Sequence, residues 1–181
     1  GLGDVYKRQG QGFDAAIGGG FELPQGVVAR KLTPAHRVLV ASPDYLARRL
    51  PVLAPEDLSH CLGILIRSPQ TGRVRSWQLT NREREHSPLV LKPAMTMSDS
   101  EAACCASAQG LGIALVSMPM AVPFLDSGAL VRVLPDWYVD DGNISIYYAE
   151  HKLLPGKTRA FVDFIIEQFA EQKLAQRFSA I

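Results

Sequence analysis

The chain has 181 residues, 47% of them hydrophobic, which is enough apolar material for one large domain or two small lobes. Its 19 Lys and Arg residues nearly balance its 18 Asp and Glu residues, and without a basic cluster we expect no duplex-binding surface. No apolar run approaches the length of a membrane span, and three cysteines are too few for a disulfide framework, which favours a reducing compartment.

The first nine residues, Gly1–Gln9, differ in character from the rest of the chain and look like translated linker sequence. We therefore leave residues 1–9 out of the fold prediction. We also expect the native chain to have continued upstream of Gly10.

Short strands alternate with short helices along the chain. The apolar segments Phe13–Gly20, His36–Ser42 and Cys61–Arg67 have the composition and length of strands, and the first runs into three glycines. Ser42 followed by Pro43 predicts the start of a helix, because Ser caps well and Pro suits the first helical position. A turn-rich loop with one aromatic anchor, Trp77, comes after the third strand.

The segment MTMSDSEAACCASAQGLGIALVSMP (95–119) predicts a strand, a helix of small residues, a glycine stop at Gly110 and a second strand. Ser98 and Glu101 match the capping-box pattern, so Ser98 is the expected N-cap. Because the first N–H groups of a helix carry partial positive charge, Ser98 and Ser100 are candidates for binding an anion. The plainer alternative is that Ser98 only caps the helix.

The C-terminal part predicts a short helix interrupted by Pro123, a strand over residues 144–150 and a long final helix from about Pro155. The final helix is expected to pack on a sheet through one apolar stripe, made of Ala160, Phe161, Phe164, Ile165 and Phe169. Alternating strands and helices with short connections predict an α/β architecture with largely parallel sheets.

The sequence predicts no catalytic residue, no metal site and no cofactor. GKT at residues 156–158 lacks the glycine that a phosphate-binding loop needs five positions earlier, where His151 stands. Adjacent cysteines on a helix point in different directions, so Cys104 and Cys105 are expected to be buried small hydrophobic residues rather than metal ligands. No serine lies in a GxSxG context.

The segments occur in a telling order: GFDAAIGG, HRVLVASPDYLARR, PEDLSHCLGILIR, SDSEAACCASAQGLGIALVS, GALVRVLPDW and ISIYYAEHKLLPGKTRAFVDFI. Together they closely resemble the C-terminal effector-binding domain of LysR-type transcriptional regulators. The resemblance runs from about Gly12 to Phe169. Its most specific pieces are VASPDYLA, AQGLGIALV and TRAFVDF.

The resemblance implies an α/β fold like that of the type 2 periplasmic binding proteins, with two Rossmann-like lobes joined by two crossover strands. Residues 10–42 and 144–181 would form the first lobe, and residues 43–143 the second. The first lobe is expected to be incomplete, because the strand, helix and strand that open the domain in this family are missing. A small organic anion would bind in the inter-lobe cleft.

Ligand contacts in this family come from strand-to-helix loops. The resemblance therefore implies effector-binding roles for seven residues: Gly18, Gly19, Arg67, Ser68, Ser98, Ser100 and Ser117. Arg67 is the natural bidentate partner of a carboxylate, and a surface salt bridge is its alternative role.

The resemblance also implies a function. The chain would be the effector-sensing domain of a cytoplasmic bacterial transcription regulator, without enzymatic activity and without a membrane segment. The full-length protein would be a dimer or tetramer, and it would contact DNA only through a missing N-terminal helix-turn-helix domain. The alternative is a periplasmic solute-binding protein that serves a transporter. An enzyme on the same scaffold would need a nucleophile or an acid–base pair, and neither is found.

Overall fold

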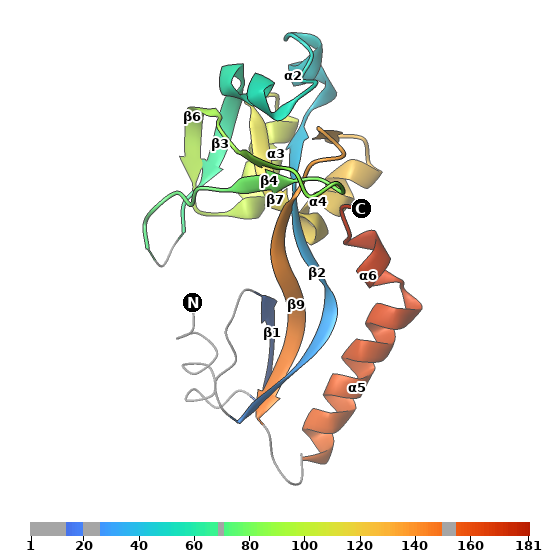
Figure 1. Cartoon of the computed structure of the whole chain (residues 1–181). Coiled ribbons are helices and arrows are strands. Elements are labelled where there is room, and N and C mark those ends of the chain that lie inside the picture. The colour runs from blue at the N-terminus through green and yellow to red at the C-terminus, as the bar shows by residue number, and fades with distance from the viewer. Residues whose placement is uncertain (1–13, 20–25, 69–70, 150–154) are drawn as a thin grey trace. The chain divides into compact units, whose positions relative to one another are not determined.

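The structure, a computed structural model, describes residues 14–19, 26–68, 71–149 and 155–181 (Figure 1). It divides into two compact units. Unit 1 comprises Gly1–Ala35 and Asp141–Ser179, and unit 2 comprises His36–Asp140 and Ala180–Ile181. Two long strands, β2 (Val27–Ala41) and β9 (Val139–Ala149), run from one unit into the other.

The sheet of unit 2 is built around β3 (Leu62–Ile66), which pairs in parallel with β6 (Lys92–Met97) and with β7 (Ile113–Ser117). The crossover from β6 to β7 is helix α3 (Ser100–Ala108), as parallel strands require. The second half of β2 instead runs antiparallel to β7 and to β8 (Val131–Val133). The sheet is therefore mixed, and the prediction of largely parallel pairing holds only around β3.

The remaining elements of unit 2 are short. They are helix α2 (Pro43–Ala47), the 3-10 helix η1 (Pro55–His60), the paired strands β4 (Gln78–Thr80) and β5 (His86–Pro88), and helix α4 (Met118–Asp126). The predicted start of α2 is confirmed, since the Ser42 hydroxyl accepts the Tyr45 N–H at 3.2 Å. Pro123 lies inside α4, as expected.

The N-terminus of α3 differs from the prediction. Its N-cap is Asp99, whose carboxylate accepts the Ala102 N–H at 2.7 Å, so the capping box of Ser98 and Glu101 is wrong. A carboxylate is a charged acceptor and one of the best N-cap groups, which favours starting the helix one residue later. The predicted glycine stop is confirmed, because Gly110 follows the C-cap with φ 78°.

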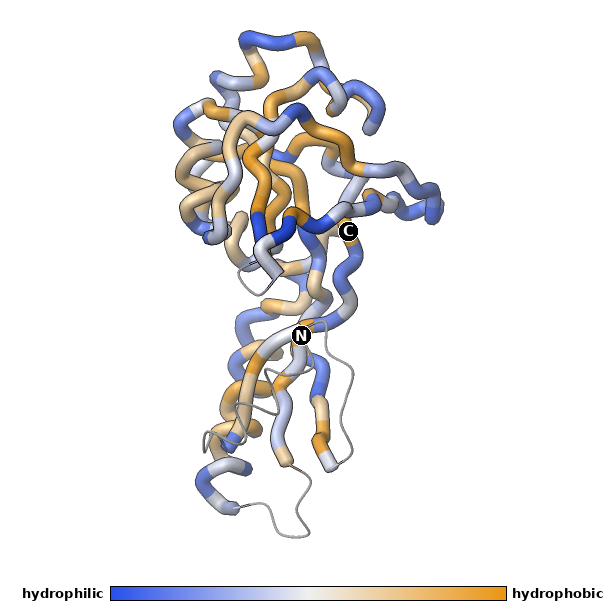
Figure 2. The backbone as a smooth tube through the Cα atoms, turned by 90° about the vertical axis from the view of Figure 1, so that its left-hand side faces the viewer, coloured by the Kyte–Doolittle hydropathy of each residue, from blue (hydrophilic) through white to orange (hydrophobic). Residues whose placement is uncertain are grey.

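The small side chains of α3 let the helix lie close to the sheet. Ala103, Cys104 and Ser107 are fully buried. The Ser107 hydroxyl lies 2.8 Å from the Gly112 carbonyl and 3.1 Å from the Val40 carbonyl, which ties the helix to the residue before β7 and to β2. The tube in Figure 2 shows apolar stretches concentrated on the strands of this unit, where the main core forms.

The described residues of unit 1 form one further strand and two helices. Strand β1 (Ala15–Gly19) pairs antiparallel with β9, and the helices are α5 (Gly156–Glu171) and α6 (Leu174–Arg177). Its buried cluster contains Leu32, Ile146 and Val162, with four partly buried neighbours packed against it: Tyr148, Ile165, Ile166 and Phe169.

The apolar stripe of α5 is only partly the predicted one. Val162, Ile165, Ile166 and Phe169 follow the 3-4-7 spacing of one helix face and contact the cluster. Ala160, Phe161 and Phe164 are exposed instead, with Phe161 at 47% and Phe164 at 55%. The buried face is therefore centred on Val162, which clusters with Leu32 and Ile146.

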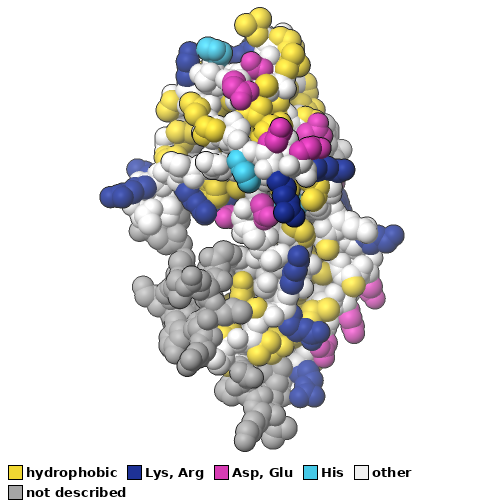
Figure 3. Space-filling model, viewed as in Figure 1, with side chains coloured by type: hydrophobic (Ala, Val, Ile, Leu, Met, Phe, Trp, Pro, Cys, Tyr) yellow, Lys and Arg dark blue, Asp and Glu magenta, His cyan; other side chains and the backbone are white. Residues whose placement is uncertain are grey.

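The last residues of the chain belong to unit 2. The Ala180 N–H donates to Nδ1 of the buried His36 at 2.9 Å, and the Ala180 carbonyl accepts from Arg132 at 2.8 Å. In the described part of the chain, no helix is long and apolar enough to cross a membrane. Lys and Arg side chains are scattered among Asp and Glu on the face shown in Figure 3.

Candidate functional site

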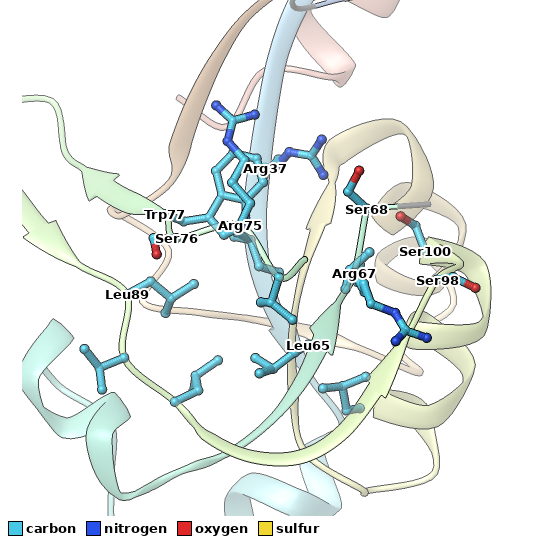
Figure 4. Close-up of a pocket in the computed structure, with 16 residues that line it drawn as sticks. Arg37, Leu65, Arg67, Ser68, Arg75, Ser76, Trp77, Leu89, Ser98 and Ser100 are labelled. Atoms are coloured by element: carbon cyan, nitrogen blue, oxygen red, sulfur yellow. The ribbon is translucent and has the colours of Figure 1, made fainter. Parts of the chain in front are cut away.

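A pocket of about 540 Å³ opens on unit 2 where parallel strands end (Figure 4). Arg67 and Ser68 directly follow β3, and Ser98 directly follows β6. Because β3 and β6 are parallel, their carboxyl ends meet at one edge of the sheet, where α/β proteins usually bind ligands. The Arg67 N–H donates to the Met97 carbonyl at 2.7 Å and joins the two strand ends.

Four of the seven predicted site residues line this pocket: Arg67, Ser68, Ser98 and Ser100. Figure 4 shows them along the same side of it. Ser68 begins a tight loop, in which its hydroxyl accepts the Thr71 N–H at 3.3 Å and its carbonyl accepts the Gly72 N–H at 2.8 Å. These local bonds join Ser68 to Thr71 and Gly72 beside the pocket.

The N-terminus of α3 is less positive than the sequence suggested. The Asp99 carboxylate already occupies the Ala102 N–H, and its negative charge opposes the partial positive charge of the helix end. Asp99 itself does not line the pocket. The attraction for an anion therefore depends more on the full charge of Arg67 than on the helix end.

The other three predicted residues do not line the pocket. Ser117 is the last residue of β7 and pairs with Arg37 on the neighbouring strand β2. It is the N-cap of α4, but its side chain makes no capping hydrogen bond. Gly18 and Gly19 belong to unit 1 and lie inside β1 rather than in the loop after it. Gly19 has a structural reason to be glycine, because a Cβ there would stand 2.8 Å from the Asn143 carbonyl oxygen.

Sequence reasoning missed a second group of pocket residues, namely Arg37, Arg75 and Trp77. The guanidinium carbon of Arg37 lies 4.7 Å from the Trp77 ring centroid, and that of Arg75 lies 4.1 Å from it, so both are in range for cation–π attraction. One signal was available: Arg37 interrupts an apolar strand two residues before Leu39, on the same face. Its partner Trp77 lies far away in sequence.

The pocket combines positive charge with apolar walls. Three of its lining residues are arginines, and none of the described residues that line it is acidic. Its apolar lining comes mainly from β3, from the segment around β5 and from β7: Ile64, Leu65, Ile66, Val74, Leu89, Val90, Leu91 and Leu115. Such a lining suits a small organic molecule that carries negative charge.

The thiols of unit 2 do not form a reactive site. Burial raises the pKa of Cys104 to about 11 and also raises the pKa of Cys61. Cys105 is exposed, so its predicted burial is wrong, while that of Cys104 is confirmed. Neighbours on a helix differ by about 100° in direction, which places one on the sheet and the other in solvent. The described residues contain no cluster of His, Cys, Asp and Glu that could hold a metal ion.

Fold and pocket together define the class of protein. A mixed α/β sheet carries a polar and apolar pocket at its strand ends, which is the arrangement of a small-molecule binding domain. The chain belongs to the LysR substrate binding domain family, whose family model matches residues 3–170. The predicted family is thereby confirmed.

Curated relatives are transcription regulators. The chain is 30% identical over 170 residues to the HTH-type transcriptional regulator PtxR of Pseudomonas aeruginosa, covering 92% of this chain and 53% of that protein. It is 33% identical over 163 residues to the HTH-type transcriptional regulator DmlR of Escherichia coli, covering 89% of this chain and 52% of that protein. The chain thus spans about half the length of these relatives, and as a domain of this family it is not an enzyme.

Solved structures agree on the fold. The regulatory domain of AphB from Vibrio vulnificus superposes with a TM-score of 0.73 at 27% identity, covering 87% of this chain and 76% of that one. The full-length structure of the Vibrio cholerae virulence activator AphB, a member of the LTTR protein family, superposes with a TM-score of 0.72 at 30% identity. The match covers 87% of this chain and 52% of that one. The predicted α/β fold of the periplasmic-binding type is therefore confirmed.

Proposed function

We propose that this chain is the effector-sensing part of a cytoplasmic bacterial transcription regulator, and that its effector is a small organic anion bound beside Arg67. The observation that carries this proposal is the composition of the pocket. Three arginines and four serines line it, without an acidic residue among the described lining residues. An anion is the ligand that such a lining stabilises.

Each polar residue has a role in this proposal. The planar guanidinium of Arg67 can donate two parallel hydrogen bonds to one carboxylate, which are among the strongest in proteins. The hydroxyls of Ser98 and Ser100 can donate to the same group without adding charge. The apolar wall around Leu65 and Leu89 would cover the body of the ligand.

The regulatory consequence follows from linkage. An effector that binds one conformation of the full-length protein more tightly than another shifts the population toward that conformation. In the full-length protein this shift would change the arrangement of a homo-oligomer on DNA. Contact with DNA would be made by an N-terminal helix-turn-helix domain, in keeping with the HTH-type names of the relatives.

The test is carboxylate binding by wild-type chain and by Arg67→Gln, measured by calorimetry at low ionic strength. Losing a charge-assisted hydrogen bond costs about 1.5–3 kcal/mol, so we expect the affinity to fall about tenfold or more. Arg73→Gln is the matched control, because Arg73 is exposed in the same loop and does not line the pocket. Equal affinity in all three proteins would refute the proposal.

Asp99→Asn tests the same site in the opposite direction. The Asn side-chain oxygen can still accept the Ala102 N–H, so the cap is kept while the negative charge is removed. We expect carboxylates to bind about two- to fivefold more tightly, in line with the 0.3–1 kcal/mol of a charge at a helix end. Combined Ser98→Ala and Ser100→Ala should weaken binding. If none of Arg67→Gln, Asp99→Asn and the double serine variant changes the affinity for a carboxylate, that ligand binds at another site.

A further inference from the structure

We infer that the pocket has two anion-binding ends and takes a dianion whose acidic groups are separated by an apolar spacer. This inference rests on the proposed function, which concerns only the end at Arg67. We call that end, with Ser98 and Ser100, the serine end. The other end consists of Arg37, Arg75 and Trp77, and we call it the tryptophan end.

The two ends lie on different sides of the pocket. Figure 4 shows Arg67, Ser98 and Ser100 on one side, and Trp77 with the two other arginines on the opposite side. They come from different elements. The serine end is formed at the ends of β3 and β6, while the tryptophan end joins β2 to the loop that leads into β4. A single carboxylate bound at Arg67 therefore occupies only one of the two ends.

The tryptophan end gathers two positive charges around one ring. Both guanidinium groups lie over the Trp77 ring, at 4.7 Å for Arg37 and 4.1 Å for Arg75. A guanidinium has five N–H donors, so an arginine that already has a partner can still donate to an anion. An anion that lies beside both arginines is attracted by two full positive charges.

Much of the remaining pocket lining is apolar. In Figure 4 Leu65 lies between the two ends and Leu89 lies below Trp77, and no acidic residue is found among the described lining residues. A highly hydroxylated ligand would bury its polar groups against these leucines without partners, which is costly. A hydrocarbon spacer instead removes apolar surface from water, at about 25 cal/mol per Å². Two charged ends and an apolar middle match the lining.

The experiment compares two ligand series on the 181-residue chain. Straight-chain dicarboxylates from succinate to sebacate are titrated by calorimetry, beside the monocarboxylates of matching length. We expect at least one dicarboxylate of intermediate length to bind about tenfold more tightly than its monocarboxylate partner, the gain of one further charge-assisted interaction. Arg75→Gln should remove this advantage and weaken dicarboxylate binding much more than monocarboxylate binding, whereas Arg67→Gln should weaken both series by a similar factor.

Trp77 supplies a second readout. In a Trp137→Phe variant, the tryptophan fluorescence comes from Trp77 alone. A dicarboxylate that draws the two guanidinium groups away from the Trp77 ring should change this fluorescence. A monocarboxylate bound at the serine end should leave it unchanged. Arg73→Gln is again the matched control, since it removes a loop arginine outside the pocket.

The outcomes separate this inference from the proposed function. Equal affinity for both series at every length, or an equal loss in both series with Arg75→Gln, overturns the two-ended pocket while a site at Arg67 still stands. Absence of binding in both series overturns the inference and the proposed function together.

Discussion

The two units of the molecule differ in how much core they build. Among the described residues, one buried cluster of unit 2 has eleven hydrophobic members: Leu39, Ala41, Tyr45, Leu58, Cys61, Leu79, Ile113, Leu115, Val133, Leu134 and Val139. The cluster of unit 1 in the same part of the chain has three, Leu32, Ile146 and Val162. Parallel strands with a crossover helix bury apolar side chains on both faces of a sheet, whereas α5 is the main described cover of the strands in unit 1. The pocket lies in the unit with more core to hold its shape.

Core truncation should show the largest difference between the two units. Leu39→Ala and Ile146→Ala each remove a fully buried side chain, and each should cost about 2–5 kcal/mol. Hydrogen exchange followed by mass spectrometry should show Leu39→Ala exposing amides of unit 2 and weakening carboxylate binding. Ile146→Ala should expose amides of unit 1 while unit 2 stays protected. If each variant exposes amides of both units equally, the two units unfold together, which would contradict a separate core for each unit.

A partly buried hydrogen bond should give the next largest effect. The Tyr45 hydroxyl accepts the Leu62 N–H at 2.8 Å and lies 3.4 Å from the Leu62 carbonyl, so Tyr45→Phe leaves an N–H without a partner. We expect unfolding in urea to show a loss of about 1–3 kcal/mol. Tyr148→Phe in unit 1 is the control and should be nearly neutral. A similar loss in both variants would argue against this bond as the cause.

Alkaline pH should weaken unit 2 selectively. Burial raises the pKa of Cys104 from 9.0 to about 11, and it raises the pKa of Tyr45 as well. Between these two values the unfolded thiol ionises while the folded one keeps its proton, so stability is complete below about pH 9 and falls as the pH rises toward 11. Urea unfolding across this pH range should show the decline in stability, and Cys104→Ala should make stability fall less steeply with pH.

The three thiols should also differ in reactivity. A thiol reagent at neutral pH should modify the exposed Cys105 before the buried Cys61 and Cys104.

The smallest effect is expected on the outer face of α5. Phe164 is 55% exposed, so Phe164→Ser should change the free energy of unfolding by less than about 1 kcal/mol. The matched comparison is Val162→Ala on the buried face of the same helix, which should cost clearly more. Thermal unfolding at two protein concentrations measures both. A large, concentration-dependent loss with Phe164→Ser would mean that copies of the chain cover this face in solution.

The sequence predicted the ends of helices correctly where a single residue fixes the local backbone conformation. Ser42 with Pro43 starts α2, and Gly110 ends α3, because capping groups and positive φ angles act within a few residues. The N-cap was harder to predict where two neighbouring residues can both cap the same helix. Asp99 displaced Ser98 as the N-cap, since both residues can cap and only the final path of the chain selects one.

The family, the order of strands and helices, and the placement of polar residues directly after β3 and β6 can all be read from the sequence, because these features depend on short-range patterns along the chain. The tertiary structure alone decided which face of α5 is buried and that Arg37 and Arg75 share the ring of Trp77. Arg37 lies in β2 and Trp77 in the loop before β4, and only the pairing of β2 with β7 and of β7 with β3 brings them to one pocket. Contacts between distant segments depend on the whole set of strand pairings, which no local pattern records.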